Sequence, residues 1–191
     1  FNTLKAIEIT KGPASALYGS DALGGLISFE SLEAEDLLLP SEDFVVEIPS
    51  SYDSSDDGLS ASIKIATRLS DKTSGLFIFT REDSSELKVK ADSKYIDNET
   101  SEGNNYFINI TQNIGDFSKA NVIYENIDRQ LDIQTKEDNL SSMTSTNTKS
   151  GQTSTYQKVV TDTKTLRDRV SLSYEYDNPD SDNFVKSLNA Q

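Results

Sequence analysis

The chain has 191 residues and a formal net charge of −14, with 32 acidic residues against 18 basic ones and no Cys, His or Trp. Without His or Cys, these residues cannot supply an imidazole base, a thiolate nucleophile or an ordinary protein ligand for zinc or haem. The acidic balance and the lack of a basic stripe exclude nucleic acid as an expected partner.

The sequence carries no signature of a membrane helix or of a carboxylate-based active site. Hydrophobic residues make up 35% of the chain, and no run approaches the ~20 apolar residues that a spanning helix needs. No pair of carboxylates can be placed on one face as in a hydrolase, so we do not expect an enzyme. The chain starts at Phe1 within a predicted strand and stops at Gln191 within another. We therefore expect an internal part of a longer protein.

The first distinctive stretch runs from Lys11 to Gly25 and reads KGPASALYGSDALGG. Gly19 and Gly24 have the spacing of a phosphate-binding loop. That loop requires Lys and then Ser or Thr at the next two positions, where this chain has Gly25 and Leu26. The match fails at the residues that would carry the chemistry, so we do not predict phosphate binding.

The same stretch predicts a strand, a helical turn and a second strand. Alternating apolar residues favour strands at Leu4–Thr10 and Leu26–Glu30. Pro13 can occupy the first position of a short helix over Ala14–Tyr18, and Gly19 can end that helix in a left-handed conformation. The glycine pair that follows allows a sharp turn into the second strand.

Beyond this motif, the chain alternates between segments of period two and polar connections. In Gly58–Leu69 and Leu166–Tyr176, apolar side chains take one face and polar or charged ones take the other. Such alternation is typical of strands with one apolar face. Seven segments are predicted as strands on this basis: Phe44–Tyr52, Gly58–Leu69, Ser74–Arg81, Tyr106–Ile114, Phe117–Ile127, Leu166–Tyr176 and Phe184–Ala190.

The connections between these segments alternate between short and long from Ser70–Thr73 onward. Two of them are long and polar, Glu82–Gly103 and about Asp128–Thr165, whereas the intervening turn at Gly115 is minimal. Short turns at one end and long loops at the other are typical of an outer-membrane β-barrel. A soluble β-sandwich stays open as the alternative.

A barrel would give each face of the strands a role. Seven apolar residues are expected to form one outward band facing lipid: Leu59, Ile63, Ile65, Ile108, Val122, Val170 and Leu172. Aromatic residues are expected to flank that band, with Tyr52 and Tyr106 toward the long loops and Phe44, Tyr174, Tyr176 and Phe184 toward the short turns. Charged residues are expected to point into the lumen: Lys64, Arg68, Arg81, Arg167, Arg169 and Glu175.

The stretch IEITKGPASALYGSDALGGLISFE, within about Ala6 to Glu30, closely resembles the C-terminal end of the plug domain in TonB-dependent outer-membrane receptors. The resemblance implies a structural motif rather than a ligand site. Its residues are Lys11, Gly12, Pro13, Tyr18, Gly19, Asp21, Gly24 and Gly25. The implied organisation is mainly β: residues 1–40 form the end of the plug and a linker. Residues 41–191 form about seven antiparallel strands of a transmembrane barrel, as an incomplete, open sheet.

Two further stretches, SLEAEDLLLP and the segment from Tyr52 to Leu87, resemble the branch of haem and haemoglobin receptors and of transferrin or lactoferrin receptors. The resemblance implies energised import of haem or iron-bearing ligands across the outer membrane of a Gram-negative bacterium. The implied partners are outer-membrane lipid, haem or a haem carrier, and the TonB complex through a segment outside this chain. The haem-holding histidines of that branch have no counterpart here, so we expect no cofactor in these residues.

Two alternatives to a haem receptor stay open, and one stretch has a partial metal-site pattern. Siderophore and cobalamin receptors share the plug motif, and a soluble β-sandwich that acts in binding or adhesion belongs to a different class. The stretch Asp53–Gly58 hints at a calcium loop, but Ser55 and Lys64 occupy positions where the EF-hand pattern needs acidic ligands. An acidic surface turn is the preferred interpretation.

Overall fold

Antiparallel pairing organises nearly all of the secondary structure. The computed structural model describes residues 2–11, 25–86, 98–134, 143–146, 153–156, 160–178 and 187–190. Within these ranges the chain forms strands and one 3-10 helix, η1 (Ala34–Asp36). No helix among the described residues is long and apolar enough to cross a membrane.

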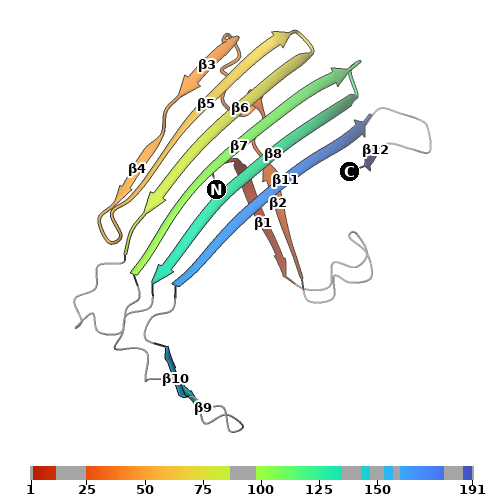
Figure 1. Ribbon diagram of the computed structural model, residues 1–191. Coiled ribbons are helices and arrows are strands. Elements are labelled where there is room, and N and C mark those ends of the chain that lie inside the picture. The colour runs from red at the N-terminus through yellow and green to blue at the C-terminus, as the bar shows by residue number, and fades with distance from the viewer. Residues whose placement is uncertain are drawn as a thin grey trace.

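The main sheet is a broad curved layer (Figure 1). Its strands run in the order β12-β11-β8-β7-β6-β5-β3, with β4 also paired to β5. They are β3 (Phe44–Glu47), β4 (Ser50–Asp53), β5 (Gly58–Ser70), β6 (Thr73–Ser84), β7 (Asn98–Ile114), β8 (Ser118–Gln134), β11 (Val160–Asp177) and β12 (Ser187–Ala190). Among the described residues, β3 and β12 end the order without further partners. The prediction of about seven antiparallel strands in an open sheet is confirmed.

The predicted strand Phe44–Tyr52 is divided in two at Pro49. Its halves, β3 and β4, pair with successive parts of β5. Proline has no N–H to donate and interrupts a ladder, although the carbonyl of Pro49 still accepts a hydrogen bond from the Ser62 N–H (2.9 Å). The edge position of this segment makes the interruption tolerable.

Three strands extend furthest beyond their predicted segments. β7, β8 and β11 have 17, 17 and 18 residues, and each extends past its predicted segment toward the long connections. The added residues of β7 and β11 are mostly polar on both faces, so alternation of hydrophobicity cannot reveal them. The added part of β8 keeps Leu131 and Ile133 on one face, and this short alternation was not recognised. Pairing with neighbouring strands, rather than apolar patterning, sustains them.

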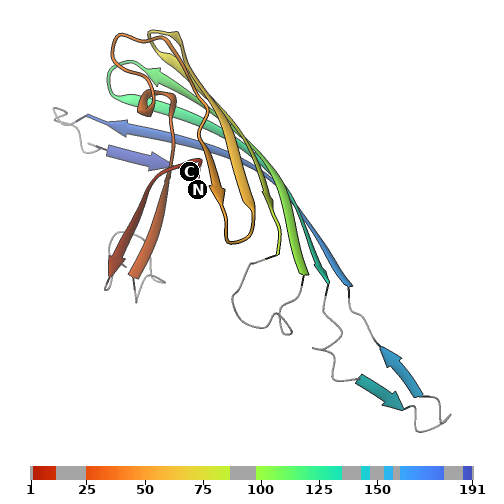
Figure 2. The same cartoon turned by 90° about the vertical axis from the view of Figure 1, so that its left-hand side faces the viewer.

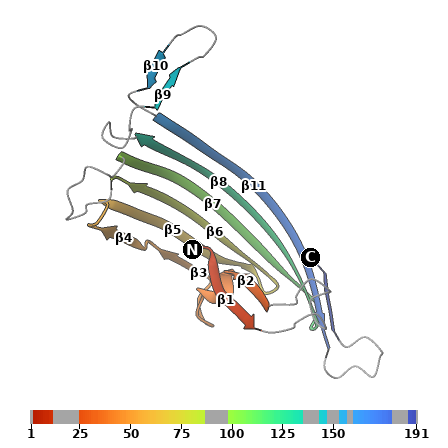
Figure 3. The ribbon, with the colours of Figure 1, turned by 90° about the horizontal axis from the view of Figure 1, so that it is seen from below.

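The connections lie at two ends of the sheet, as predicted. Short turns join β5 to β6 and β7 to β8, and Gly115 adopts φ +67° in the second. The long connections leave from the opposite end, where a small two-stranded sheet lies beyond β8 and β11 (Figures 1 and 3). It consists of β9 (Met143–Thr146) and β10 (Thr153–Tyr156).

A separate hairpin comes first in the chain. β1 (Leu4–Lys11) pairs with β2 (Gly25–Ser31), as predicted for two strands around the motif. Gly25 adopts φ +145°, and a Cβ there would lie 2.6 Å from the Thr10 carbonyl oxygen, so this position requires glycine. The hairpin and η1 lie on the concave side of the main sheet (Figures 2 and 3).

The core lies between the concave face and the segment Leu32–Asp43, which we call the linker. Its buried apolar residues are Leu32, Ala34 and Leu38 from the linker, and Ala66, Leu76, Ile78 and Phe107 from the sheet. The sequence predicted a polar concave face, and this part of the prediction is wrong. The linker covers an apolar patch there, which lets large side chains occupy positions that would otherwise meet water.

The predicted apolar band lies on the convex face. Pairing puts Ile65, Phe77 and Ile108 in one row, which continues to Tyr124 and Val170. Six of the seven predicted band residues are exposed, and Ile65 is half-buried. The seven residues therefore share one face, and among the described residues no second sheet covers it.

Adjacent residues on opposite faces give a direct test of this core. Phe107 is fully buried, whereas Ile108 is 38% exposed on the convex face. Phe107→Ala should lower the free energy of unfolding by about 3–5 kcal/mol, because it leaves a cavity against the linker. Ile108→Ala serves as the control and should cost clearly less. Equal losses in urea unfolding of the two variants would contradict the assignment of the covered face.

Candidate functional site

The structure places the ends of the predicted plug motif but not its middle. Lys11 and Gly25 face each other at the end of the hairpin. The other motif residues lie outside the described residues: Gly12, Pro13, Tyr18, Gly19, Asp21 and Gly24. What the described residues define is how the hairpin is attached to the sheet. This attachment, through the linker to the concave face, is the candidate functional site.

The linker is compact because its backbone turns on itself twice. The N–H groups of Leu37 and Leu38 donate to the Ala34 carbonyl, each at 3.1 Å. A second turn brings the Glu42 N–H to the Leu39 carbonyl (2.9 Å), and the Leu39 N–H donates to the Glu42 carboxylate (3.3 Å). These turns direct Leu32, Ala34 and Leu38 toward the sheet and leave the carboxylates of the linker at its margins.

The backbone of one residue, Leu32, links the start of the hairpin to the sheet. The Leu32 N–H donates to the Thr3 carbonyl of the hairpin (2.9 Å), and the Leu32 carbonyl accepts from Asn109 Nδ2 (2.7 Å). Asn109 is 1% exposed, so its hydrogen bond is made in a water-poor setting where an unpaired partner is costly. Next to it, Asn2 Nδ2 donates to the Ser62 hydroxyl (2.9 Å).

Glu33 fixes the start of the linker to β8. Its Oε1 accepts from Lys119 Nζ (2.9 Å) and from Asn121 Nδ2 (3.2 Å). Asn121 is buried, and the carboxylate of Glu33 is largely covered. Reduced contact with water strengthens this charge-assisted contact relative to an ordinary surface ion pair.

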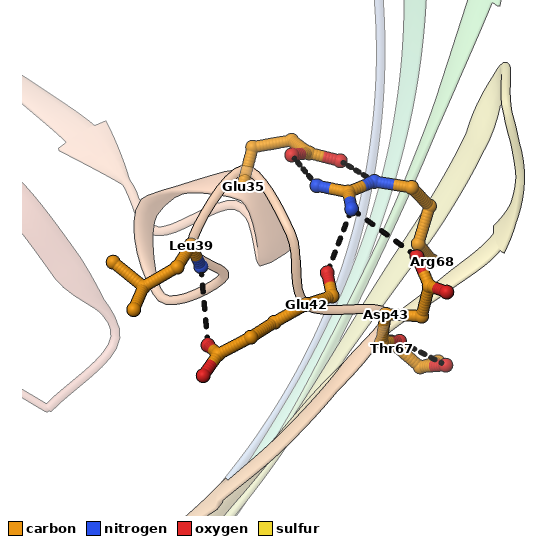
Figure 4. A network of polar contacts seen from close by, with 6 residues as sticks. All are labelled: Glu35, Leu39, Glu42, Asp43, Thr67 and Arg68. Atoms are coloured by element: carbon orange, nitrogen blue, oxygen red, sulfur yellow. Dashed lines mark hydrogen bonds and ion pairs between the residues drawn. The ribbon is translucent and has the colours of Figure 1, made fainter.

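Arg68, near the short-turn end of β5, fixes the rest of the linker (Figure 4). Its guanidinium contacts Glu35 through Nη2 (2.7 Å) and Nε (3.3 Å), in the two-pronged geometry that favours arginine. Its Nη1 donates to the Glu42 carbonyl (2.6 Å) and to Asp43 Oδ1 (3.3 Å). One side chain therefore binds three residues of the linker.

Lys5 ties the hairpin to the linker from the other side. Its Nζ lies 3.0 Å from Glu30 Oε1 on β2 and 3.0 Å from Asp36 Oδ1 on η1. The hydrogen bonds with Glu30 and then Asp36 raise the pKa of Lys5 above its ordinary value. Its ammonium therefore stays charged throughout the neutral range, and the contact is insensitive to physiological pH.

The predicted lumen-facing charges fall on the concave face with one exception. Pairing places Lys64, Arg68, Arg167, Arg169 and Glu175 on that face. The prediction for Arg81 is wrong. Arg81 pairs with Ala61 and points to the convex face, where it contacts Asp83 (2.6 Å) and Glu102 (2.7 Å). Beyond the apolar band the convex face is polar too, so a charged residue in this part of a strand does not indicate the concave face.

The acidic turn predicted at Asp53–Gly58 uses its carboxylates locally. Asp53 Oδ1 accepts from the Ser55 N–H and Asp56 Oδ1 from the Gly58 N–H, both at 2.9 Å. The hydrogen bond from Ser55 lowers the pKa of Asp53. Within the described ranges, no group of three or more acidic, His or Cys side chains could hold a metal ion.

Several residues of the site escaped the sequence analysis. Glu33, Glu35, Asn109, Lys119 and Asn121 carry contacts between residues far apart in sequence. No local pattern distinguishes them from other polar residues. The short apolar series Leu32, Ala34 and Leu38 was the one available signal that the linker packs against something.

Comparison with curated proteins gives partial matches of one kind. The chain is 32% identical to transferrin-binding protein A of Haemophilus influenzae over 93 residues, which is 49% of this chain and 10% of the relative. It is 46% identical to a hemin receptor of Yersinia pestis over 61 residues, 31% of this chain and 9% of the relative. It is 43% identical to heme/hemopexin utilization protein C of Haemophilus influenzae over 49 residues, 26% of this chain and 7% of the relative.

These similarities support a relationship with receptors of the haem and transferrin type. The names describe receptors and binding proteins rather than enzymes. The matched residues span about a tenth or less of the length of these curated relatives. No family profile matches the chain.

The role of Arg68 can be tested by hydrogen exchange. Arg68→Gln removes the guanidinium that holds Glu35 and Asp43, so the amides of the linker should exchange faster with solvent. Arg81→Gln is a matched control, because Arg81 also binds two carboxylates but on the convex face, away from the linker. Exchanging the charges, with Arg68→Glu and Glu35→Arg together, should restore part of the protection. Unchanged linker exchange in Arg68→Gln would refute the anchoring role.

Proposed function

We propose that this chain is part of a TonB-dependent outer-membrane receptor that imports haem or another iron-bearing ligand. Residues 1–40 would be the end of the plug and its linker, and residues 41–191 the first strands of the barrel wall. The whole protein would do no covalent chemistry. It would bind its ligand on the outside and admit it when the TonB complex, acting through a segment beyond this chain, rearranges the plug.

The observation that carries this proposal is the hairpin held on the concave face of a sheet whose convex face is apolar and open. A soluble protein with this arrangement would expose Val170 and Leu172 to water at 73% and 66% of their surface. A contiguous apolar face of this kind needs a partner. Lipid is a partner that suits an antiparallel sheet with a polar interior and a curved shape.

The distribution of residues along the convex face suits a bilayer slab. The row of Ile110, Val122 and Leu172 is aliphatic. Phe79 and Tyr106 lie on its side toward the long connections and Tyr174 on its side toward the short turns, as in the girdles of outer-membrane barrels. At the margin toward the long connections, the Tyr124 hydroxyl donates to Asp168 Oδ1 (3.0 Å) and Asn126 Nδ2 donates to the same oxygen (2.9 Å). Polar groups of this kind belong at the level of lipid headgroups rather than in the hydrocarbon.

Haem is the preferred ligand because of the names of the relatives and the resemblance of the linker and first wall strands to that branch. Siderophore or cobalamin import is the alternative within the same fold. A soluble β-sandwich with a binding role is the alternative from another class. It would need a second sheet over the convex face, and β1 and β2 lie on the concave side instead (Figure 2).

Depth-dependent substitution tests the membrane assignment. Leu172→Arg lies in the aliphatic band, and we expect it to cost about 2–4 kcal/mol of folding free energy in lipid. Leu166→Arg lies on the same face and strand, beyond the polar row of Asp168, and should cost about 0–1 kcal/mol. Unfolding in phospholipid vesicles measures both. Equal costs at the two positions would argue against a bilayer around this face.

Import is tested in the organism that carries the gene. Deleting the gene for the whole protein, in a strain without a second haem receptor, should abolish growth on haem as sole iron source. Growth on an inorganic ferrous salt is the control and should persist. Unchanged growth on haem would remove the haem assignment, and a parallel loss on a siderophore would redirect it to the alternative ligand.

A further inference from the structure

We propose that Arg129, Arg167 and Arg169, here called the arginine cluster, bind carboxylate groups of the transported ligand on the concave face. The inference rests on the proposed function and gives its ligand a chemical class. It also assigns the contact to the barrel wall, whereas the resemblance to the haem branch points only to histidines that this chain does not contain.

The first observation is a separation of charge between the two faces of β8 and β11. In the parts of these strands near the long connections, pairing places the three arginines on the concave face with a single carboxylate, Glu125. The convex face of the same parts carries Asp128, Asp132, Asp162 and Asp168, with Lys164 as its cation. In a chain of net charge −14, the concave side of this region is locally cationic.

The three arginines are neighbours by register. Arg167 and Arg169 alternate along β11 on one face, which separates their Cα atoms by about 7 Å. Arg129 pairs with Thr165, so it lies diagonal to Arg167, within reach of long side chains. A ligand with two carboxylates could therefore contact more than one guanidinium at once.

Two of the arginines lack a carboxylate partner among the described residues. Arg167 makes no hydrogen bond or ion pair with them, and the Nε of Arg129 donates to the Ser101 hydroxyl (3.2 Å). Arg169 lies 3.3 Å from Glu125 Oε2 through Nε, but the buried N–H is not aimed at that oxygen and has no acceptor. The cluster thus holds more donor capacity than the sheet itself satisfies.

The space beside Arg129 is open to a ligand. A cavity of about 230 Å³ lies between the start of the hairpin, at Asn2 and Thr3, and the wall at Arg129, and its lining also includes Glu82 but not the other two arginines. Gly103 lies across from Arg129, and the Cγ of the arginine would be 3.6 Å from a Cβ at that position. The absent side chain leaves room for the guanidinium to reach over β7 toward this cavity.

The chemistry selects carboxylates over other groups. Arginine offers a planar fork that matches the two oxygens of a carboxylate, and such charge-assisted contacts are stronger than neutral hydrogen bonds. Guanidinium groups also stay charged at every physiological pH. Haem carries two carboxylates as propionates, and citrate-type iron chelators carry several, so both fit the cluster.

The test compares haem with its dimethyl ester, in which both carboxylates are capped as neutral esters. Binding is measured on the whole purified receptor in detergent, for the wild type, Arg167→Gln and Arg129→Gln. The wild type should bind haem at least tenfold more tightly than the ester. Each variant should lose about tenfold in affinity for haem and almost none for the ester. Arg81→Gln, on the convex face, is the matched control and should behave as the wild type.

The outcomes separate this inference from the proposed function. Wild-type receptor that binds haem and its ester equally, or variants that weaken both ligands equally, would overturn the arginine cluster alone. Variants that only alter thermal unfolding, with ligand discrimination intact, would assign the arginines to contacts within the protein and also overturn it. If the wild type binds no haem, the haem assignment fails, and the same variants are measured with ferric citrate. A tenfold loss there supports the cluster, and no loss overturns it.

Discussion

The pairing register of β5 through β11 is the constraint on which the rest of the structure depends. Because successive side chains of a strand point to opposite faces, a slip of one residue would exchange the two faces completely. With the observed register, Ile65 and Ile108 share the open convex face, while Ala66 and Phe107 share the covered concave face. The linker can pack only on the second of these, and lipid or another apolar partner only on the first.

The linker converts this two-faced sheet into a scaffold for the hairpin. The hairpin itself makes few direct contacts with the sheet among the described residues, such as that of Asn2 with Ser62. Most of its attachment passes through Leu32, whose carbonyl is bound by Asn109 of the sheet, and through Asp36 of η1, an element that lies against β5, β6 and β7. In the receptor proposed above, the hairpin would therefore be tied to the wall mainly through the linker.

Charge follows the same division into faces. Near the long connections, the acidic residues of β8 and β11 gather on the convex face and the arginines on the concave face. Repulsion within each set is screened by water and salt on its own side of the sheet. The strands therefore present different electrostatic surfaces to the exterior and to the lumen of the proposed barrel. An anionic ligand would be attracted to the concave side.

The sequence by itself determined the strands, because period-two alternation is a local property of neighbouring residues. It located the hairpin around Lys11–Gly25, the glycine requirement at its end and the division of short and long connections, since turns are also local. It could not show that Pro49 splits a strand while both halves still pair with β5. It also missed the ends of β7 and β11, where both faces are polar.

Only the tertiary structure decided what each face contacts. The linker covers Leu76 and Phe107 on a face that alternation had marked as polar, because the covering residues come from a distant part of the chain. Arg81 lies on the convex face and Arg68 binds the linker, although both are arginines in strands of similar pattern. The physical reason is that burial and ion pairing depend on which segments meet in space. The register of the strands and the path of the linker set these meetings, and no short stretch of sequence encodes either of them.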